Sequence, residues 1–343
     1  MGAIATIGLD LAKSVFQVHA VDTAGNVVVR RALRRSQLLD FFERTPPCLV
    51  GMEACASAHY WTREIGKLGH QVRIMPATYV KAYVKRNKTD AADAEAICEA
   101  VTRPTMRFVP VKSDVEQSIN MMLKTRDLLT RQRTQVVNAL RSHLAELGIV
   151  AAAGFKASAR LILIVRDDTD HRLPPIARYT LTEIADQIER LTEKIAKLEK
   201  MIVSSVRQDD VARRLTSIPG VGPITAAAVR ALVPDPAGFR TGRDFAAWVG
   251  LTPQANSSGG KQKLGSISKR GNAQLRSLFM VGAMAILRTS KYGATMRPWV
   301  ASLLKRRPFK VVAVAMANKT ARVIWALMMK GECYREPSVV SNA

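Results

Sequence analysis

Two carboxylates at the ends of apolar strand segments are the first residues in this 343-residue chain that could do chemistry. Asp10 ends one short apolar run, and Glu53 ends another in the same manner. Burying a carboxylate at such a place is costly unless something compensates for its charge. Asp90 and Asp93 lie three residues apart at the start of an expected helix, so both project from one face. Singly, Asp10 could be a turn residue and Asp90 an N-cap; the set of four indicates a site.

The elements around these carboxylates predict a mixed α/β fold. Strands are expected at residues 3–9, 15–21, 26–32, 48–52 and 71–75, and helices at 37–44, 56–68 and 89–102. Three antiparallel strands followed by helix, strand, helix, strand and helix is the order of an RNase H-like fold. In that order the first and fourth strands are neighbours and the last helix packs across them, so the four carboxylates would converge. Oxygen ligands suit Mg²⁺ or Mn²⁺, and two such ions can clamp the attacking and leaving oxygens of a phosphodiester.

The middle of the chain is expected to be helical. Residues 115–147 form a long amphipathic segment, and an unbroken three-four spacing of apolar residues follows from Leu181 to Ile202. This three-heptad seam favours two-stranded pairing. Three interpretations stay open: a coiled coil between subunits, a hairpin with 115–147 in the same chain, and an ordinary core helix.

Positive charge is concentrated in the last part of the chain. The formal net charge is +24, and residues 206–343 carry +16 of it. Residues 245–331 hold 15 Lys or Arg, and neither a carboxylate nor a histidine. A charge excess of this size argues against a small-molecule enzyme without a polyanionic partner and indicates contact with nucleic-acid phosphates. This segment cannot supply a carboxylate ligand or a conventional general base, so any chemistry there must borrow those groups.

Two glycine-containing segments of the basic region could contact phosphates. Residues 217–223, Ser-Ile-Pro-Gly-Val-Gly-Pro, resemble the turn of a helix–hairpin–helix module, whose backbone N–H groups can hold a phosphate. Residues 251–271 form a polar, basic loop that lacks the P-loop pattern. A serine there is a weak nucleophile without an activating group, so Ser258 would depend on the distant carboxylates. The candidate nucleic-acid contacts are Gly220, Gly222, Lys261, Lys263, Lys269, Arg270, Arg276, Lys305, Arg306 and Arg307.

The order and spacing of several motifs resemble those of one known family. The motifs are Ile7-Gly8-Leu9-Asp10, Glu53-Ala54, Asn87-Lys88-Thr89-Asp90-Ala91-Ala92-Asp93-Ala94, Ser217-Ile218-Pro219-Gly220-Val221-Gly222, Phe245-Ala246-Ala247-Trp248-Val249-Gly250-Leu251-Thr252-Pro253, Ser257-Ser258-Gly259-Gly260 and Ile267-Ser268-Lys269-Arg270-Gly271. Over nearly its whole length the chain resembles the DEDD transposases of bacterial insertion-sequence family 110, which are described as bridge-RNA-guided recombinases.

The resemblance implies a catalytic arrangement. A RuvC-like domain of RNase H fold would hold Mg²⁺ with Asp10, Glu53, Asp90 and Asp93. A helical coiled-coil linker would join it to a mainly α transposase domain with a helix–hairpin–helix-like element. In that domain a serine attacks DNA and forms a covalent phosphoserine; by position it maps to Ser258, with Ser257 beside it as the alternative. In the family the serine and the carboxylates come from different subunits.

The expected organisation and partners follow from both lines of argument. The domains are expected at residues 1–110, 111–206 and 207–335, with a tail at 336–343. The partners are donor and target double-stranded DNA, a structured guide RNA, and further copies of the chain: a dimer through the coiled coil and a tetramer when two DNAs are joined. No membrane span and no secretory signal are expected, and the four cysteines should be free thiols in a bacterial cytoplasm.

Two other functions fit the same residues. One is a metal-dependent RuvC-like nuclease or junction resolvase that cuts by hydrolysis. The other is a non-catalytic nucleic-acid-binding protein, which the presence of all four carboxylates disfavours.

Overall fold

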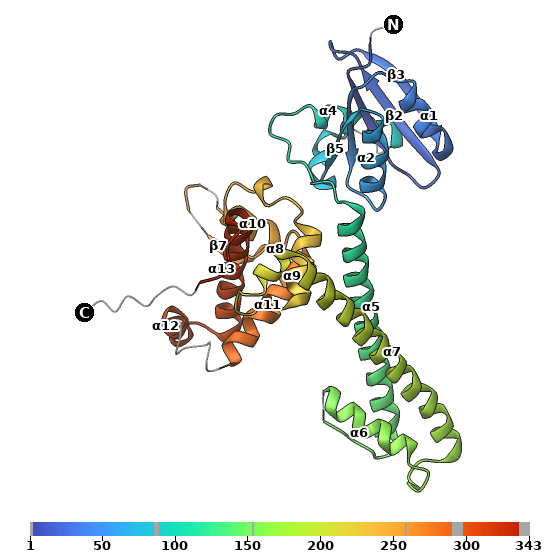
Figure 1. Ribbon diagram of the computed structural model, residues 1–343, viewed down its shortest axis with the longest axis vertical. Helices are drawn as coiled ribbons and strands as arrows, with labels where there is room; N and C mark the ends of the chain where they lie inside the picture. The colour runs from blue at the N-terminus through green and yellow to red at the C-terminus, as the bar shows by residue number, and fades with distance from the viewer. Residues whose placement is uncertain are drawn as a thin grey trace, which may run out of the picture. The chain divides into compact units, whose positions relative to one another are not determined.

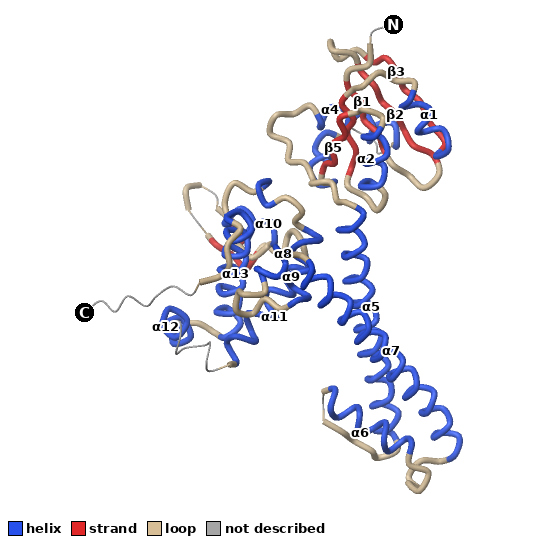
Figure 2. Tube along the Cα trace, in the orientation of Figure 1, coloured by secondary structure: helices blue, strands red, loops and turns tan. Residues whose placement is uncertain are grey.

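The chain forms two compact units, which are described separately. The structure, a computed structural model, describes residues 3–85, 89–152, 154–257, 259–261, 263–289 and 298–335. The first unit ends at Asp114 and contains the strands of one mixed sheet, and the second begins at Val115 and is mostly helical (Figures 1 and 2). The domain boundary expected near residue 206 remains a prediction, as does the assignment of 336–343 as a tail, which lies outside the described residues.

The first unit is built on a five-stranded sheet. Its strands are β1 (Thr6–Asp10), β2 (Val15–Val21), β3 (Val27–Arg34), β4 (Leu49–Glu53) and β5 (Gln71–Met75), in the spatial order β3-β2-β1-β4-β5. The first three strands are antiparallel, whereas β1, β4 and β5 are parallel. The expected strands are therefore present, and the first and fourth are neighbours. This confirms a mixed α/β sheet in the N-terminal part of the chain.

Helices cover both faces of this sheet. α1 (Leu38–Glu43) and α2 (Ala58–Lys67) share a core with the side chains of Ile7, Leu9 and Phe16. α4 (Asp90–Val101) packs on the opposite face, across β1, β2 and β4. The short α3 (Ala77–Val80) and the 3₁₀ turn η2 (Lys81–Tyr83) follow β5 and were not expected from the sequence. Alternation along each strand explains the two faces, because successive side chains point to opposite sides.

Two long helices and a short one begin the second unit. α5 (Asp114–Glu146) and α7 (Pro175–Gln208) run antiparallel, and α6 (Phe155–Arg166) packs against them. Arg126 of α5 donates from Nε to Glu199 of α7 at 2.8 Å, near one end of the pair. Leu140 and Leu144 pack in one cluster with Leu181 and Ile188 near the other end. The heptad seam is thus largely buried within its own chain, as the hairpin interpretation predicted.

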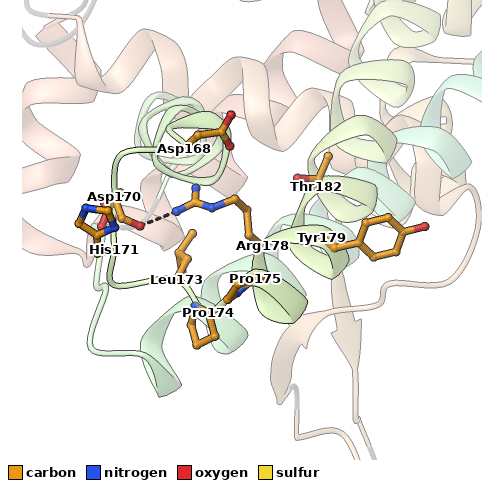
Figure 3. A pocket seen from close by; sticks show the side chains of 9 residues that line it. All are labelled: Asp168, Asp170, His171, Leu173, Pro174, Pro175, Arg178, Tyr179 and Thr182. Atoms are coloured by element: carbon orange, nitrogen blue, oxygen red, sulfur yellow. Dashed lines mark hydrogen bonds between the residues drawn. The ribbon is translucent and has the colours of Figure 1, made fainter.

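The connection between α6 and α7 is held by one arginine. Arg178 donates to the carbonyl oxygens of Val165, at 3.0 Å, and of Asp167 and Asp170. Arg178 lines a cavity of about 510 Å³, and Figure 3 shows its guanidinium directed towards the backbone at Asp170. Its guanidinium satisfies carbonyls at the end of α6 and in the following loop, so we assign this cavity a structural role.

The remainder of the second unit is a helical core with one small hairpin. Its helices are α8 (Asp210–Leu215), α9 (Pro223–Leu232), α10 (Gly242–Val249), α11 (Ala273–Arg288), α12 (Pro298–Arg306) and α13 (Phe309–Lys330). The sequence predicts helices near residues 211–217, 223–233, 242–249, 271–287, 294–304 and 309–330 in this part, and the observed helices match them within a few residues, although residues 294–297 lie outside the described residues. By length and apolar composition α13 could cross a membrane, yet Val312, Met316 and Ile324 are fully buried in this core. Its apolar character is therefore explained by packing.

Candidate active site

Asp10 occupies the carboxyl end of a central strand. In β1 the side chains of Ile7 and Leu9 are fully buried towards α1 and α2, so Gly8 and Asp10 face α4 on the other side. Glu53 ends β4, the parallel neighbour of β1, where Leu9 is paired with Met52. Both carboxylates therefore lie at the same edge of the sheet, because neighbouring parallel strands end together.

Two glycines allow α4 to approach this edge. A Cβ at Gly8 would lie 2.1 Å from the carbonyl oxygen of Ala94, and a Cβ at Gly51 would lie 2.7 Å from Cβ of Val101. Gly8 and Gly51 are paired across β1 and β4, so they leave a flat surface without side chains on which the helix packs. Thr89 caps α4 by accepting a hydrogen bond from the backbone N–H of Ala92 at 3.2 Å. The capped first turn of α4 is thereby placed beside Asp10.

Three carboxylates meet at this point. Ligand oxygens of Asp10, Asp90 and Asp93 all lie within 4.8 Å of one another, with Asp10 and Asp93 partly buried and Asp90 exposed. Glu53 is not in this group, but it lines a neighbouring cavity of about 530 Å³ together with Asp93. Residues 86–88, which include the start of the motif before Asp90, lie outside the described residues. The structure thus brings three of the four predicted ligands together and places the fourth alongside.

The electrostatics of the cluster are unfavourable without a cation. Burial, followed by repulsion from Asp93, Asp90 and Glu53, raises the pKa of Asp10 to about 6 from its usual 3.8. A divalent cation would relieve this repulsion, and an all-oxygen donor set is what Mg²⁺ and Mn²⁺ prefer. The residues present therefore fit a divalent metal.

Sequence reasoning missed the lysines beside the carboxylates. Lys81 and Lys85 line the same 530 Å³ cavity as Glu53 and Asp93, and Lys85 donates to Glu95 at 2.8 Å. The turn that carries Lys81 follows β5 at the carboxyl edge of the sheet. Their position after a strand at the carboxyl edge of the sheet, where open α/β sheets bind ligands, is the signal that could have revealed them.

The predicted serine segment is held by a small hairpin. β6 (Pro253–Ala255) pairs antiparallel with β7 (Leu264–Ile267), where the sequence indicated a flexible loop throughout. Two extended segments separated by Gly259-Gly260 are a hairpin signal that would have predicted these strands. Ser257 is exposed in the connection. Ser258, the predicted nucleophile, lies outside the described residues.

Most of the predicted cationic contacts are exposed. They lie on the hairpin, after it, and at the end of α12: Lys261, Lys263, Lys269, Arg270, Lys305, Arg306 and Arg307. Arg276 is different, because it is partly buried and its Nη1 donates to the carbonyl oxygen of Val249 at 2.9 Å. This bond ties α11 to the last turn of α10 and gives Arg276 a structural role that the sequence did not indicate.

The two glycines of the predicted phosphate turn have different surroundings. α8 and α9 flank the turn and pack together. Gly220 has a positive φ of 80°, and a Cβ there would lie 2.9 Å from the carbonyl oxygen of Gly282 in α11. Gly222 lies just before α9 with open space around it. Packing thus explains Gly220, whereas phosphate contact stays a prediction for both.

Comparison with known proteins identifies the family. Residues 7–149 match the DEDD transposase model of the IS110 family, described as "Transposase", and residues 212–297 match the "Transposase IS116/IS110/IS902 family". A probable family 20 transposase of Pseudomonas aeruginosa is 50% identical over 97% of this chain and 99% of its own length.

More distant relatives carry related names. The transposase for insertion sequence element IS1328 of Yersinia enterocolitica is 37% identical over 97% of this chain and 99% of its own length. A pilin gene-inverting protein of Moraxella lacunata is 23% identical over 76% of this chain and 73% of its own. The DEDD domain implies a RuvC-like fold, which agrees with the mixed sheet, and the family's enzymes transfer DNA strands, typically with a divalent metal. The chain belongs to the IS110/IS116/IS902 family of transposases.

Proposed function

We propose that this transposase cuts and rejoins DNA through a covalent phosphoserine, guided by a structured RNA. The observation that carries the proposal is the convergence of Asp10, Asp90 and Asp93 beside Glu53 in a chain whose segment 245–331 has 15 cations and no carboxylate. One part of the chain can hold metal ions and another can hold nucleic acid. Cutting and rejoining DNA needs both the bound metal ions and the bound nucleic acid.

The carboxylates would hold Mg²⁺ or Mn²⁺. When bound by Asp10, Glu53, Asp90 and Asp93, these ions supply charge stabilisation to the attacking and leaving oxygens of a phosphodiester. Asp10 is the central ligand of the set, because its pKa responds to all three other carboxylates. Asp90 and Asp93 project from the first turn of α4, which Gly8 and Gly51 seat on the sheet.

Ser258 would be the nucleophile. Its Oγ would give up its proton to solvent and form a bond to phosphorus while the bond to the departing strand oxygen breaks, and that oxygen would take up a proton from solvent. A hydroxyl of the new partner strand then attacks the phosphoserine, which restores the serine. Because a phosphodiester replaces a phosphodiester at each step, strands are exchanged without ATP. Hydrolysis would discard this bond energy.

The choice of DNA site would be delegated to a guide RNA. The candidate cations, on the hairpin and at the end of α12, are exposed side chains suited to backbone phosphates, which carry little sequence information. Pairing between RNA and DNA would supply the specificity that such contacts lack. The inversion named for the Moraxella relative and the transposition named for the Yersinia relative both need strand exchange.

The working assembly would contain several copies in the bacterial cytoplasm. In a composite site, Ser258 of one copy approaches the carboxylates of another, in a dimer or, with two DNAs, a tetramer. Because α5 already covers much of the heptad seam of α7, a dimer through the coiled coil would have to use the exposed sides of this hairpin.

The test is a covalent adduct assay. The protein is incubated with the transcript of the DNA flanking its gene, Mg²⁺ and end-labelled DNA, then denatured and separated by size. We expect a protein–DNA adduct that is lost in Ser258→Ala and in Asp10→Ala. Ser257→Ala and Asp40→Ala, an exposed carboxylate on α1, should retain it.

Two results would reject the proposal. Normal cleavage by Ser258→Ala, without an adduct, would indicate a hydrolytic nuclease or junction resolvase of the same fold. Absence of cleavage with any divalent metal would indicate a binding protein. Equal activity with and without the transcript would reject the guide RNA alone.

A further inference from the structure

The second unit contains a cavity that the proposed site does not use. It measures about 550 Å³ and lies between α13, Trp299 of α12 and the base of the β6–β7 hairpin. This size is within the usual range for small-ligand sites. Its walls are mostly apolar, and its polar side chains are Asn318, Lys319 and Arg322. No carboxylate lines it.

One face of α13 forms the largest wall. Val311, Val314, Ala315, Asn318, Lys319 and Arg322 recur every three or four residues, so they share one side of the helix. These side chains are exposed or partly exposed, whereas Val312, Met316 and Ala317 between them are fully buried in the core. The wall is therefore presented by a rigid helix.

The polar lining of the cavity consists of two cations, the indole N–H of Trp299 and the amide of Asn318, whose Nδ2 donates to the Leu251 carbonyl oxygen at 3.3 Å. Lys319 Nζ lies 4.7 Å from the centre of the Trp299 ring. Trp299 Nε1 and Arg322 Nε are buried without a hydrogen-bond partner among the described residues. Buried donors are normally paired, so these two nitrogens are unusual features of side chains that line the cavity. Two cations and no carboxylate select an anionic ligand.

A nucleotide has both an apolar aromatic part and a negative charge, which match the apolar walls and the cations of this cavity. Its base has a flat aromatic face for an indole and apolar walls, and its phosphate has acceptor oxygens for Lys319 and Arg322. A bare phosphate would not use the apolar walls, and an apolar ligand would not use the cations. A base within duplex DNA is stacked and cannot enter, so the nucleotide must be unstacked.

The cavity touches the two strands that carry the serine segment. Pro253 and Ile267 both line it, and they are paired with each other in the β6–β7 hairpin. The connection with Ser257 and Ser258 lies between these strands. A nucleotide in the cavity would therefore hold its strand against the base of the hairpin.

We propose that this cavity binds one unstacked DNA nucleotide next to the phosphate that is cut, with Trp299 against the base and Lys319 and Arg322 at the phosphate. The inference rests on the proposed function, because it assumes that the hairpin carries the nucleophile. It adds a positioning site: Trp299 and Lys319 hold the strand, and the reaction occurs at the neighbouring phosphate with Ser258 and the carboxylates.

The first test measures how much binding depends on a base. The full chain in EDTA is titrated with dT₈ and with an abasic octamer of equal charge. For the wild type we expect about tenfold weaker binding of the abasic strand. Trp299→Leu should reduce this ratio to near one. Lys319→Gln should weaken binding of dT₈ several-fold more than Lys310→Gln, an exposed lysine of the same helix outside the cavity.

Several results would overturn the inference. Equal affinities of the two octamers for the wild type would exclude a base site, and an unchanged ratio in Trp299→Leu, with native circular dichroism, would place it elsewhere. A base-dependent ratio for U₈ but not for dT₈ would assign the cavity to RNA.

A second test places the nucleotide along the strand. DNA with 5-iododeoxyuridine at single positions near the cut should crosslink to Trp299 only beside the scissile phosphate, and crosslinks at remote positions would reject the placement. Binding in EDTA needs neither Ser258 nor the carboxylates. If the adduct assay fails while the base-dependent ratio stands, the proposed function is wrong and the nucleotide site remains; the reverse result removes this site alone.

Discussion

At the scale of single residues, the position of Asp10 in the carboxylate cluster is unfavourable for the folded state. Its strand position buries it among three other carboxylates, which together with burial raise its pKa to about 6. A raised pKa means that the folded state binds the proton more tightly than the unfolded chain. Ionised Asp10 therefore costs stability in full above pH 6, less as the pH falls towards 3.8, and nothing below that.

Asp10→Asn should stabilise the metal-free protein. In EDTA at pH 7.5 we expect a gain on the order of 1–2 kcal/mol, reduced from the full pKa shift because the side chain is half exposed. Thermal denaturation measures it, and the gain should disappear near pH 4, where the wild-type carboxyl is protonated.

A second carboxylate provides the control of opposite sign. Backbone and side-chain hydrogen bonds from Asn26 lower the pKa of Asp22 in the β2–β3 turn. Asp22→Asn should therefore destabilise the protein at pH 7.5. A stability of Asp10→Asn that is lower than wild type at pH 7.5 would contradict the unfavourable electrostatics of the cluster.

Mg²⁺ should stabilise the wild type but not Asp10→Asn. A ligand that binds only the folded state adds RT ln(1 + [L]/Kd), so excess Mg²⁺ should raise the melting temperature by an amount that grows with the logarithm of its concentration divided by Kd. Titration of the melting temperature with MgCl₂ tests this, with Asp40→Asn as the control. Equal shifts in wild type and Asp10→Asn would place the ion away from the cluster.

At the scale of elements, the site depends on how closely α4 approaches the sheet. Two paired glycines, one in β1 and one in β4, leave room for the helix backbone and for Val101. The sequence shows both glycines, but their purpose is visible only once the helix is placed across the strands. α4 then delivers Asp90 and Asp93 to Asp10.

Gly8→Ala and Gly51→Ala should push α4 away from the sheet. Each substitution should lower both the activity and the stability of the protein. The added Cβ would overlap the Ala94 carbonyl oxygen or the Val101 side chain, and such overpacking typically costs about 1–3 kcal/mol. At Gly51 the obstacles are Cβ, Cγ1 and Cγ2 of Val101, and because alanine keeps the Cβ at 2.7 Å, Val101→Ala should rescue Gly51→Ala only in part. It should not rescue Gly8→Ala, where the obstacle is backbone.

Gly66→Ala is the matched control for both glycine variants. Gly66 lies in α2, and a Cβ there would have no other atom within 4 Å, so alanine should add about 0.5–1 kcal/mol of stability through helix propensity. Urea denaturation measures the stability of each glycine variant and of the Gly66→Ala control, and the adduct assay measures their activity. Full activity of Gly8→Ala would show that activity does not require the close packing of α4 on the sheet.

At the scale of the whole molecule, the carboxylate cluster and most of the positive charge lie in different parts of the chain. The carboxylate cluster lies in the first unit, whereas most of the net charge lies in the second. Under the proposed function, the two kinds of group must meet before a strand is cut. The positive charge also makes DNA affinity strongly dependent on salt, because bound phosphates release counterions.

Replacing Lys305, Arg306 and Arg307 with Gln should flatten the salt dependence of DNA binding. Each lost phosphate contact reduces the slope of log Kd against log salt by about 0.9, so the triple variant should lose up to about 3. Lys194, Lys197 and Lys200 of α7 form a control with the same charge change. Equal slopes for the two triple variants would reject a specific contact at α12.

Mixing two inactive variants tests whether the active site is shared between copies. Asp10→Ala supplies an intact Ser258, and Ser258→Ala supplies intact carboxylates. If the site is composite, a mixture should recover a substantial part of the adduct, all of it attached to the Asp10→Ala chain. Recovery of none, despite confirmed co-assembly, would place both groups in one copy.

Much of this protein could be predicted from local patterns. Alternation and apolar runs indicated all five strands of the first sheet, and their order indicated that Asp10 and Glu53 end neighbouring strands. Counting charges alone separated an acid-containing part from a segment without carboxylates. These features are local or compositional, so they need no knowledge of which distant residues meet.

The tertiary structure decided the questions that depend on distant contacts. It buried the first part of the heptad seam of α7 against α5 and α6, where the sequence left three interpretations open, because any complementary apolar face satisfies such a seam. It assigned Arg276 to a carbonyl of α10, since exposure depends on what packs nearby. It also placed Asp10, Asp90 and Asp93 within one ion's reach with Glu53 alongside, because ångström distances follow from packing.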